Sequence, residues 1–219
     1  MEITELVRRL ARLQVSSLSD ADKTLPVCDP AIGPLLPDVT LVGTAFTVRS
    51  DGDLLGMIDA IGQAGPGTVL VAATDGSPLA ASGELFATEG RRRGLAGIAV
   101  DGWCRDLRGL RRVGLPVFAR GTTPAAGPAA GPSVVQVPVR FGGVEVQPGD
   151  LVFGDDDGLL IAPPERVAAA LERAEEIERV EAEVAAAMGR GRSLHEITNA
   201  AEHLRAVAAG EPSTFRFQP

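Results

Sequence analysis

Apolar and polar positions along the first half of the chain follow a strand, helix, strand rhythm. Continuous apolar runs predict buried strands over residues 39–49, 68–73 and 97–100. Amphipathic or capped stretches predict helices over residues 2–13, 16–22, 54–64 and 84–93. Asp53 is placed to cap the start of the third of these helices, and Gly94 to end the fourth. The alternation continues to residue 118 and predicts a parallel or mixed sheet with helical cover.

The pattern changes after Arg120. Residues 121–133 are rich in Gly, Pro and Ala, which fits either a flexible linker or a loop draped over a neighbouring subunit. Short strands follow, with Gly142-Gly143 as a hairpin turn, over residues 134–137, 139–141, 144–146, 151–153 and 159–162. A long helix is expected over residues 165–188. A last helix, capped by Ser193, is expected to run to about residue 209, with an apolar stripe of Leu194, Ile197, Ala201 and Leu204. We therefore expect one domain over residues 1–188 and a C-terminal helical extension and tail over residues 189–219.

Composition narrows the class of protein. The chain of 219 residues is 45% hydrophobic but only 4% aromatic, which predicts a soluble protein with an aliphatic core. A net charge of −8 argues against a nucleic-acid partner, and no stretch has the length or apolarity of a signal peptide or membrane span. Cys28 and Cys104 are far apart and form no metal-binding motif, so we expect reduced thiols and a cytoplasmic protein. Cys104 precedes Arg105, which leaves open a lowered pKa, although a buried apolar role is favoured.

The chain lacks suitably placed lysines and histidines for several common types of active site. Lys23 is the single lysine and lies in a polar segment, which argues against a P-loop and a Schiff base. Both histidines, His195 and His203, fall near the C-terminus, far from the predicted strands. Carboxylates, arginines and backbone amides remain, and this set suits a hard divalent cation such as Mg²⁺ or Mn²⁺.

Two segments are candidates for that chemistry. Arg105 and Asp106 directly follow a buried strand, where ligands of α/β sheets gather, although an ordinary ion pair at the start of a helix also fits. The segment Ser82-Gly83-Glu84-Leu85 opens a helix whose free amides can hold a carboxylate, whereas Glu84 also suits a plain role of complementing the helix dipole. One helix and one strand separate the two segments, so both can face one crevice.

At the level of motifs, the chain resembles a known family. VGTAFTV, the GEL helix start, GLAGIAVDGWCRD, LPVFARGTTP, FGGVEVQPGDLV and DDDGLLIAP, spread over residues 16–188, resemble the family of 4-hydroxy-4-methyl-2-oxoglutarate aldolases and regulators of ribonuclease activity A. The resemblance implies a swivelling-type α/β/β layered domain with a mixed sheet, followed by C-terminal helices. It also implies a homotrimer or homohexamer with sites between subunits.

The resemblance assigns roles by position. It implies that Arg105 binds substrate and that Asp106 is the direct ligand of Mg²⁺ or Mn²⁺. The turn formed by Ser82, Gly83, Glu84 and Leu85 matches the loop whose amides hold the substrate carboxylate, with Glu84 orienting a water molecule. Acidic residues from a neighbouring subunit complete such sites, and the candidates are Asp20 and either Glu178 or Glu181.

The implied function is that of a lyase acting on a small 2-keto acid. A divalent metal would assist retro-aldol cleavage of 4-hydroxy-4-methyl-2-oxoglutarate-type substrates to pyruvate, and oxaloacetate would be decarboxylated through the same pyruvate enolate. The alternative is a non-catalytic regulator that binds a ribonuclease or helicase, but such regulators lack the ligand at position 106. Ser82, Trp103 and Cys104 depart from the usual family pattern and bear on substrate size.

Overall fold

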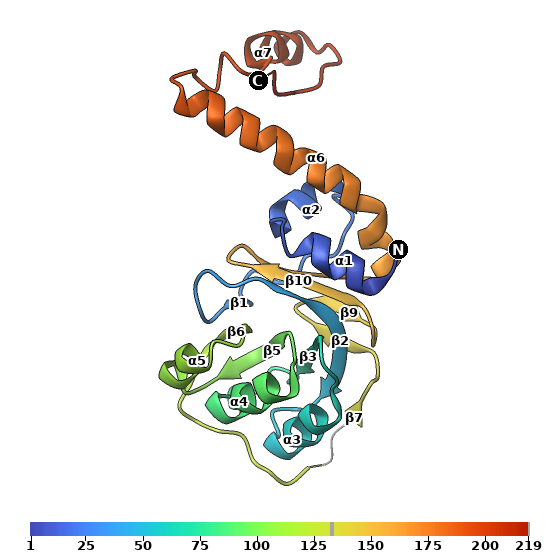
Figure 1. The fold of residues 1–219 in the computed structure, drawn as a ribbon, viewed down its shortest axis with the longest axis vertical. Coiled ribbons are helices and arrows are strands. Elements are labelled where there is room, and N and C mark those ends of the chain that lie inside the picture. The colour runs from blue at the N-terminus through green and yellow to red at the C-terminus, as the bar shows by residue number, and fades with distance from the viewer. Residues whose placement is uncertain (132–133, 219) are drawn as a thin grey trace.

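The structure is a computed structural model and describes residues 1–131 and 134–218. It is a mixed α/β fold (Figure 1). The helices are α1 (Ile3–Leu10), α2 (Val15–Ala21), α3 (Leu54–Gln63), α4 (Glu84–Arg93), α5 (Leu107–Val113), α6 (Pro164–Gly189) and α7 (Ala200–Ala209). The strands are β1 (Gly33–Pro34), β2 (Leu41–Arg49), β3 (Thr68–Ala73), β4 (Ala80–Ser82), β5 (Gly97–Cys104), β6 (Val117–Thr122), β7 (Val134–Val135), β8 (Val139–Phe141), β9 (Val144–Val146), β10 (Leu151–Asp155) and β11 (Gly158–Ala162).

One large sheet organises the fold. Its strand order is β1-β6-β5-β3-β2-β10-β11, with β4 beside β5 and β7 beside β2. The central strands β2, β3, β5 and β6 are parallel, whereas β1, β7, β10 and β11 pair antiparallel. The predicted mixed sheet is therefore confirmed. Because β3, β5 and β6 run in one direction, their carboxyl ends lie at the same edge of the sheet.

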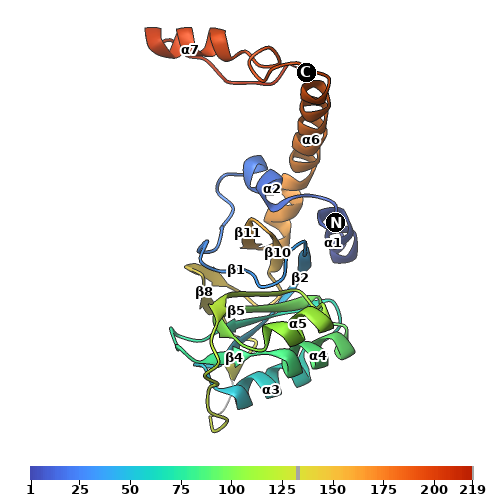
Figure 2. The same ribbon diagram turned by 90° about the vertical axis from the view of Figure 1, so that its left-hand side faces the viewer.

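Helices and short strands cover the sheet in layers. Helices α3, α4 and α5 lie on one face, where Met57, Ile61 and Leu110 pack against β-strand residues (Figure 2). The opposite face packs against the β8–β9 hairpin, with Phe118 and Phe141 in its core. A third core joins α1, α2 and α6 to the β10–β11 strands (Figure 1). The chain thus forms three apolar clusters around a common sheet.

Local signals for element ends are confirmed. Asp53 caps α3, accepting a hydrogen bond from the Leu55 N–H at 2.8 Å. Gly94 ends α4 with a left-handed φ of +76°, a conformation that glycine adopts without a Cβ penalty. Gly142 and Gly143 form the turn between β8 and β9.

The last helix begins later in the structure than the sequence predicted. Ser193 makes a capping box, because its N–H donates to Glu196 Oε2 at 2.8 Å and its Oγ accepts from the Glu196 N–H. Only a turn follows, since Ile197 is buried against the end of α6 and Thr198 pairs with Phe217. Helix α7 begins at Ala200 and has no buried residue, so the predicted apolar stripe is wrong: Leu194 and Leu204 are exposed.

The C-terminal region from Arg190 lies beyond the far end of α6, away from the sheet (Figures 1 and 2). The division of the chain at residue 188 stays a prediction. Among the described residues, none of the helices combines the length and apolar character needed to cross a membrane.

The Gly/Pro-rich segment is held along its own chain over residues 125–131, which contradicts a free linker. Ala80 exchanges backbone hydrogen bonds with Ala125 and Gly127, at 2.7 and 3.1 Å. Both Ala130 and Gly131 donate their N–H groups to Asp53 Oδ2 at 2.9 Å. We call residues 125–131 the strap. Positions 132–133 of the predicted loop lie outside the described residues.

Candidate functional site

The candidate site begins where β5 ends. Arg105 and Asp106 connect β5 directly to α5, and Asp106 is the N-cap residue of that helix. Its φ of +61° is uncommon for a residue other than glycine, and its side chain makes no capping hydrogen bond. The backbone carbonyl of Asp106 instead accepts from the N–H groups of Gly109 and Leu110, at 2.7 and 3.0 Å. The carboxylate of Asp106 therefore takes no part in capping α5, and its backbone adopts a left-handed conformation that Asp tolerates better than most residues.

Arg105 and Asp106 also form an ion pair. The Nε of Arg105 lies 3.3 Å from Oδ2 of Asp106, and the side chains are 40% and 42% exposed. A pair this open to solvent contributes only about 0–1 kcal/mol to stability. The ordinary ion pair is therefore present, and because its groups are accessible to a ligand, a functional role for the pair stays a prediction.

The start of α4 lies against this pair. Gly83 is the N-cap of α4, and a Cβ added to it would lie 2.7 Å from Asp106 Oδ2 and 3.0 Å from Arg105 Cγ. The backbone N–H of Arg105 donates to the Ser82 carbonyl at 2.9 Å. No side chain caps α4, so its first N–H groups are open to an anion. The structure therefore brings together the two segments that the sequence placed one helix and one strand apart.

Ser82 and Leu85 flank that helix start in different environments. The Ser82 side chain is 2% exposed, and its Oγ has no hydrogen-bond partner among the described residues. A buried hydroxyl without a partner is uncommon in proteins and favours a role with a ligand or water. Leu85 is 76% exposed, so its side chain contributes no packing to the site.

Glu84 lies on the side of α4 that faces α5. Its Oε1 accepts from Arg112 at 2.9 Å, and a Cβ on Gly109 would lie 2.2 Å from its Oε2. The Glu84 carboxylate thus packs against α5. Sequence reasoning missed Arg112, because only the packing of α4 on α5 brings the two residues together.

A pocket of about 300 Å³ opens beside the pair. Its lining is Arg105, Asp106, Leu107, Thr122, Thr123 and Pro124. The Thr123 N–H donates to the Cys104 carbonyl at 2.9 Å, which ties the end of β6 to the end of β5. The sequence analysis did not identify Thr122 and Thr123 as site residues. They could have been found from the rule that adjacent parallel strands end at the same edge of a sheet.

The strap directly follows Thr122, Thr123 and Pro124, which line the pocket. Asp53 holds it, and the N–H of Ala130 is the main reason that the pKa of Asp53 lies below its ordinary value, followed by those of Gly131 and Leu55. One carboxylate thus both caps α3 and fixes the segment that follows Thr122, Thr123 and Pro124.

The residues present fit a hard divalent cation held mainly by one carboxylate. Within residues 1–131 and 134–218, no group of three or more His, Cys, Asp or Glu side chains is placed to hold a metal. The described residues of one chain therefore form no zinc site with several protein ligands. Mg²⁺ commonly binds one or two carboxylates and completes its shell with water and substrate oxygens, and the open carboxylate of Asp106 suits that arrangement.

The predicted acids from a neighbouring subunit lie elsewhere in this chain. Asp20 forms an ion pair with Lys23, and Glu178 accepts from the Gln14 N–H at 2.7 Å. Asp20 and Glu181 line a larger hollow of about 580 Å³, together with Phe215 and Phe217. Residues of α6 form much of the lining of this hollow. Helix α5, which begins directly after the Arg105–Asp106 pair, lies beside the sheet and apart from α6 (Figure 1). Their role at the site of another subunit stays a prediction.

Neither cysteine supplies a nucleophile. Burial raises the pKa of Cys104 to about 12, and burial together with the charges of Asp101 and Asp29 does the same for Cys28. Both thiols are therefore protonated at neutral pH, which confirms the apolar role favoured for Cys104.

Known proteins are similar to this chain in sequence and in fold. Residues 15–161 match the family model described as RraA-like, Aldolase/RraA. A protein of Halalkalibacterium halodurans named "putative 4-hydroxy-4-methyl-2-oxoglutarate aldolase" is 35% identical over 161 residues, covering 73% of this chain and 77% of that protein. The structure of an uncharacterized Pseudomonas syringae pv. tomato protein has a TM-score of 0.77 at 27% identity, covering 87% of this chain and 91% of that chain. The RNA-processing inhibitor RraA from Thermus thermophilis has a TM-score of 0.64 at 30% identity, covering 68% of this chain and 92% of that chain.

The fold and the site define a mixed α/β protein with an arginine and a carboxylate at the carboxyl end of a central strand. Its helix start and pocket lie beside that pair. The chain belongs to the RraA-like family, and both the resemblance and the expected fold class are confirmed. The family includes relatives named as aldolases and others named as inhibitors of RNA processing, so the activity of this chain is a separate question.

Proposed function

We propose that this chain is a divalent-metal-dependent lyase that releases pyruvate from 4-hydroxy-4-methyl-2-oxoglutarate-type 2-keto acids and from oxaloacetate. The observation that carries the proposal is the contact between the uncapped start of α4 and the Arg105–Asp106 pair, beside an open pocket. This arrangement offers three things that a 2-keto acid requires: amides for its carboxylate, a cation for its oxygen and a carboxylate for a metal.

Binding would orient the substrate between α4 and Arg105. The N–H groups at the start of α4 would receive the carboxylate next to the keto group, and the guanidinium of Arg105 would lie near the keto oxygen. Arg105 would then neutralise the negative charge that develops on this oxygen as the C3–C4 bond breaks. A divalent cation held by Asp106 would supply Lewis-acid polarisation of the same oxygen.

A water molecule would take the proton from the C4 hydroxyl, and a carboxylate of the protein would orient that water. Glu84 is the acid of this chain on the first turn of α4, where it is paired with Arg112. Asp20, Glu178 or Glu181 of a neighbouring subunit are the other candidates, which requires a homotrimer or homohexamer. Oxaloacetate has no hydroxyl proton to lose, because loss of CO₂ leads directly to the same pyruvate enolate. In both reactions the enolate would then take a proton at C3 from water to become pyruvate.

The lysine position supports a metal-dependent route over a Schiff base. Lys23 is the single lysine, and its ammonium is paired with Asp20 next to α2. The Arg105 pocket has no lysine in its lining. Within one chain, a covalent route through an amine therefore has no residue at the candidate site.

Pyruvate formation from both substrates tests this proposal. We expect release from 4-hydroxy-4-methyl-2-oxoglutarate and from oxaloacetate with Mg²⁺ or Mn²⁺, and none above the uncatalysed rate with a chelator. The oligomeric state, measured by light scattering, is expected to be three or six subunits. Absence of pyruvate from both substrates, combined with a stable complex with a ribonuclease or helicase, would overturn the proposal in favour of a regulator.

A further inference from the structure

Strand β5 is irregular just before the candidate site. Val100 pairs with Ala119 of β6 and Trp103 pairs with Gly121, so that Asp101 and Gly102 together face the single residue Arg120. Such a two-against-one arrangement is a β-bulge, which bends the strand and changes the direction of the residues that follow. Arg105 and Asp106 follow the bulge after two further residues of the strand, Trp103 and Cys104.

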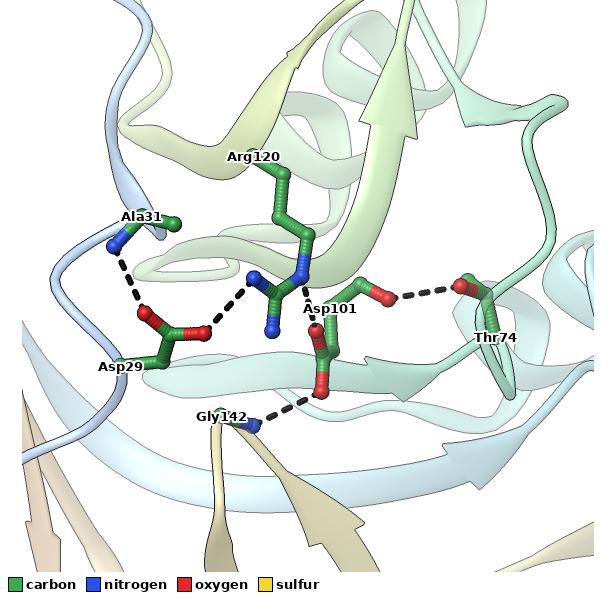
Figure 3. A network of polar contacts seen from close by, with 6 residues as sticks. All are labelled: Asp29, Ala31, Thr74, Asp101, Arg120 and Gly142. Carbon is green, nitrogen blue, oxygen red and sulfur yellow. Dashed lines mark hydrogen bonds and ion pairs between the residues drawn. The ribbon is translucent and has the colours of Figure 1, made fainter.

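A polar cluster holds the bulge from several elements (Figure 3). Asp101 Oδ1 accepts from Arg120 Nε at 2.6 Å, and its Oδ2 accepts from the Gly142 N–H at 2.8 Å. The hydroxyl of Thr74 donates to the backbone carbonyl of Asp101 at 2.6 Å. The guanidinium of Arg120 also donates from Nη1 to Asp29 Oδ2 at 2.8 Å. Strand β6, the β8–β9 hairpin and the end of β3 therefore all fix the conformation of one residue.

Packing leaves the bulge little freedom to move. The Asp101 side chain is only 19% exposed, so its ion pair is screened less by water than the surface pairs on the helices. A Cβ on Gly102 would lie 2.4 Å from Thr74 Oγ1, which shows how closely β5 approaches Thr74.

We propose that Asp101, Arg120 and Thr74 are positioning residues that hold the β5 bulge and thereby direct Arg105 and Asp106 into the pocket. Asp101 lies four residues before Arg105, and Arg120 lies two residues before Thr122, so the cluster joins the two strands whose ends form the pocket. The effect of these residues on catalysis rests on the proposed lyase function, whereas their effect on the conformation of β5 does not.

Asp101→Asn tests the proposal, and Asp29→Asn is the matched control. Both variants remove one carboxylate charge from the same guanidinium, but only Asp101 belongs to the bulged strand. We expect Asp101→Asn to lower kcat/KM for pyruvate release by about 100-fold, because small displacements of positioned groups have effects of this size. Asp29→Asn is expected to change it by less than about 3-fold. Equal losses in the two variants would overturn the proposal.

A double-mutant cycle separates positioning from simple destabilisation. In an Arg105→Ala background, Asp101→Asn is expected to have a clearly smaller effect than in the wild type, because one of the two groups that it positions is gone. An undiminished effect of about 100-fold in that background would contradict positioning through Arg105. Thr74→Val, which keeps the side-chain shape, serves as a second variant if Asp101→Asn does not fold, with an expected loss of about 10-fold.

Amide hydrogen exchange gives a readout that does not depend on lyase activity. The Arg105 N–H is bonded to the Ser82 carbonyl at 2.9 Å, so loosening of the bulge should speed its exchange in Asp101→Asn but not in Asp29→Asn. If wild-type protein releases no pyruvate, the proposed function fails while the exchange comparison still decides the role of the bulge. Unchanged exchange at Arg105 in Asp101→Asn would overturn the positioning role.

Discussion

Replacement of Gly83 by alanine places a methyl group directly between the start of α4 and the Arg105–Asp106 pair. The Gly83 φ of −175° is extended backbone that any residue adopts, so the substitution introduces no backbone strain. The added Cβ would lie 2.7 Å from Asp106 Oδ2, whereas ordinary contacts begin at 3.4 Å. The carboxylate must therefore retreat by about 0.7 Å, several times the ±0.2 Å tolerance of metal–ligand distances.

The expected effect is large on activity and small on stability. A displacement of this order lowers kcat/KM for pyruvate release by about 100-fold, which corresponds to roughly 2.7 kcal/mol of transition-state stabilisation. Stability falls by only about 1 kcal/mol from the poorer N-cap, because the most crowded atom, Asp106 Oδ2, is a side-chain end that can rotate away. Arg105 Cγ and the Arg105 carbonyl oxygen, at 3.0 and 3.3 Å, need to shift by only a few tenths of an ångström. The melting temperature should accordingly fall by roughly 2–4 °C.

Gly62→Ala provides the matched control for this variant. Gly62 is an exposed helical residue of α3, and a Cβ there would meet no atom within 4 Å. This control should retain full activity and gain up to about 1 kcal/mol of stability from the better helix propensity of alanine. Parallel pyruvate assays and thermal unfolding of both variants check the prediction. Wild-type kcat/KM in Gly83→Ala would refute the functional importance of the contact between α4 and Asp106, the proposed metal ligand.

Two further predictions concern the strap and the α4–α5 pair. Asp53→Asn should lower the melting temperature at neutral pH, because the asparagine is a weaker acceptor for the N–H groups of Ala130 and Gly131. The pKa of Asp53 in the folded protein is lowered, so the extra stability of the wild type should be present above the ordinary Asp pKa. This extra stability should disappear as the pH falls through the folded pKa. A difference in melting temperature between wild type and Asp53→Asn that stays constant down to acid pH would contradict the role of Asp53 in holding the strap. Arg112→Gln should change unfolding free energy by less than about 1 kcal/mol, because its pair with Glu84 is exposed; a larger loss in denaturant titration would show that the pair has a structural role.

Element ends set by local chemistry were predictable from the sequence. Gly94 adopts the left-handed conformation expected of a helix end, and Asp53 caps α3 through its own side chain. The position of Arg105 and Asp106 at a strand end was predictable as well, because a short apolar run before a charged pair indicates it. In each case the deciding interaction lies within a few residues along the chain.

Features decided by distant partners were not predictable. The sequence indicated a strand over residues 97–100, but β5 continues to Cys104, because the Asp101–Gly102 bulge is held by Thr74, Arg120 and Gly142. The C-terminal helix illustrates the same limit, since a capping box at Ser193 leads only to a turn once Ile197 packs on α6.

Pyruvate release by wild-type protein and Asp106→Asn, with Mg²⁺ and with a chelator, tests the central claim most directly. We expect the wild type to release pyruvate from oxaloacetate only with the metal, and the folded variant to lose roughly 100-fold or more of that activity, because its amide is a poor ligand for a hard cation. Full metal-dependent pyruvate release by Asp106→Asn would contradict the account.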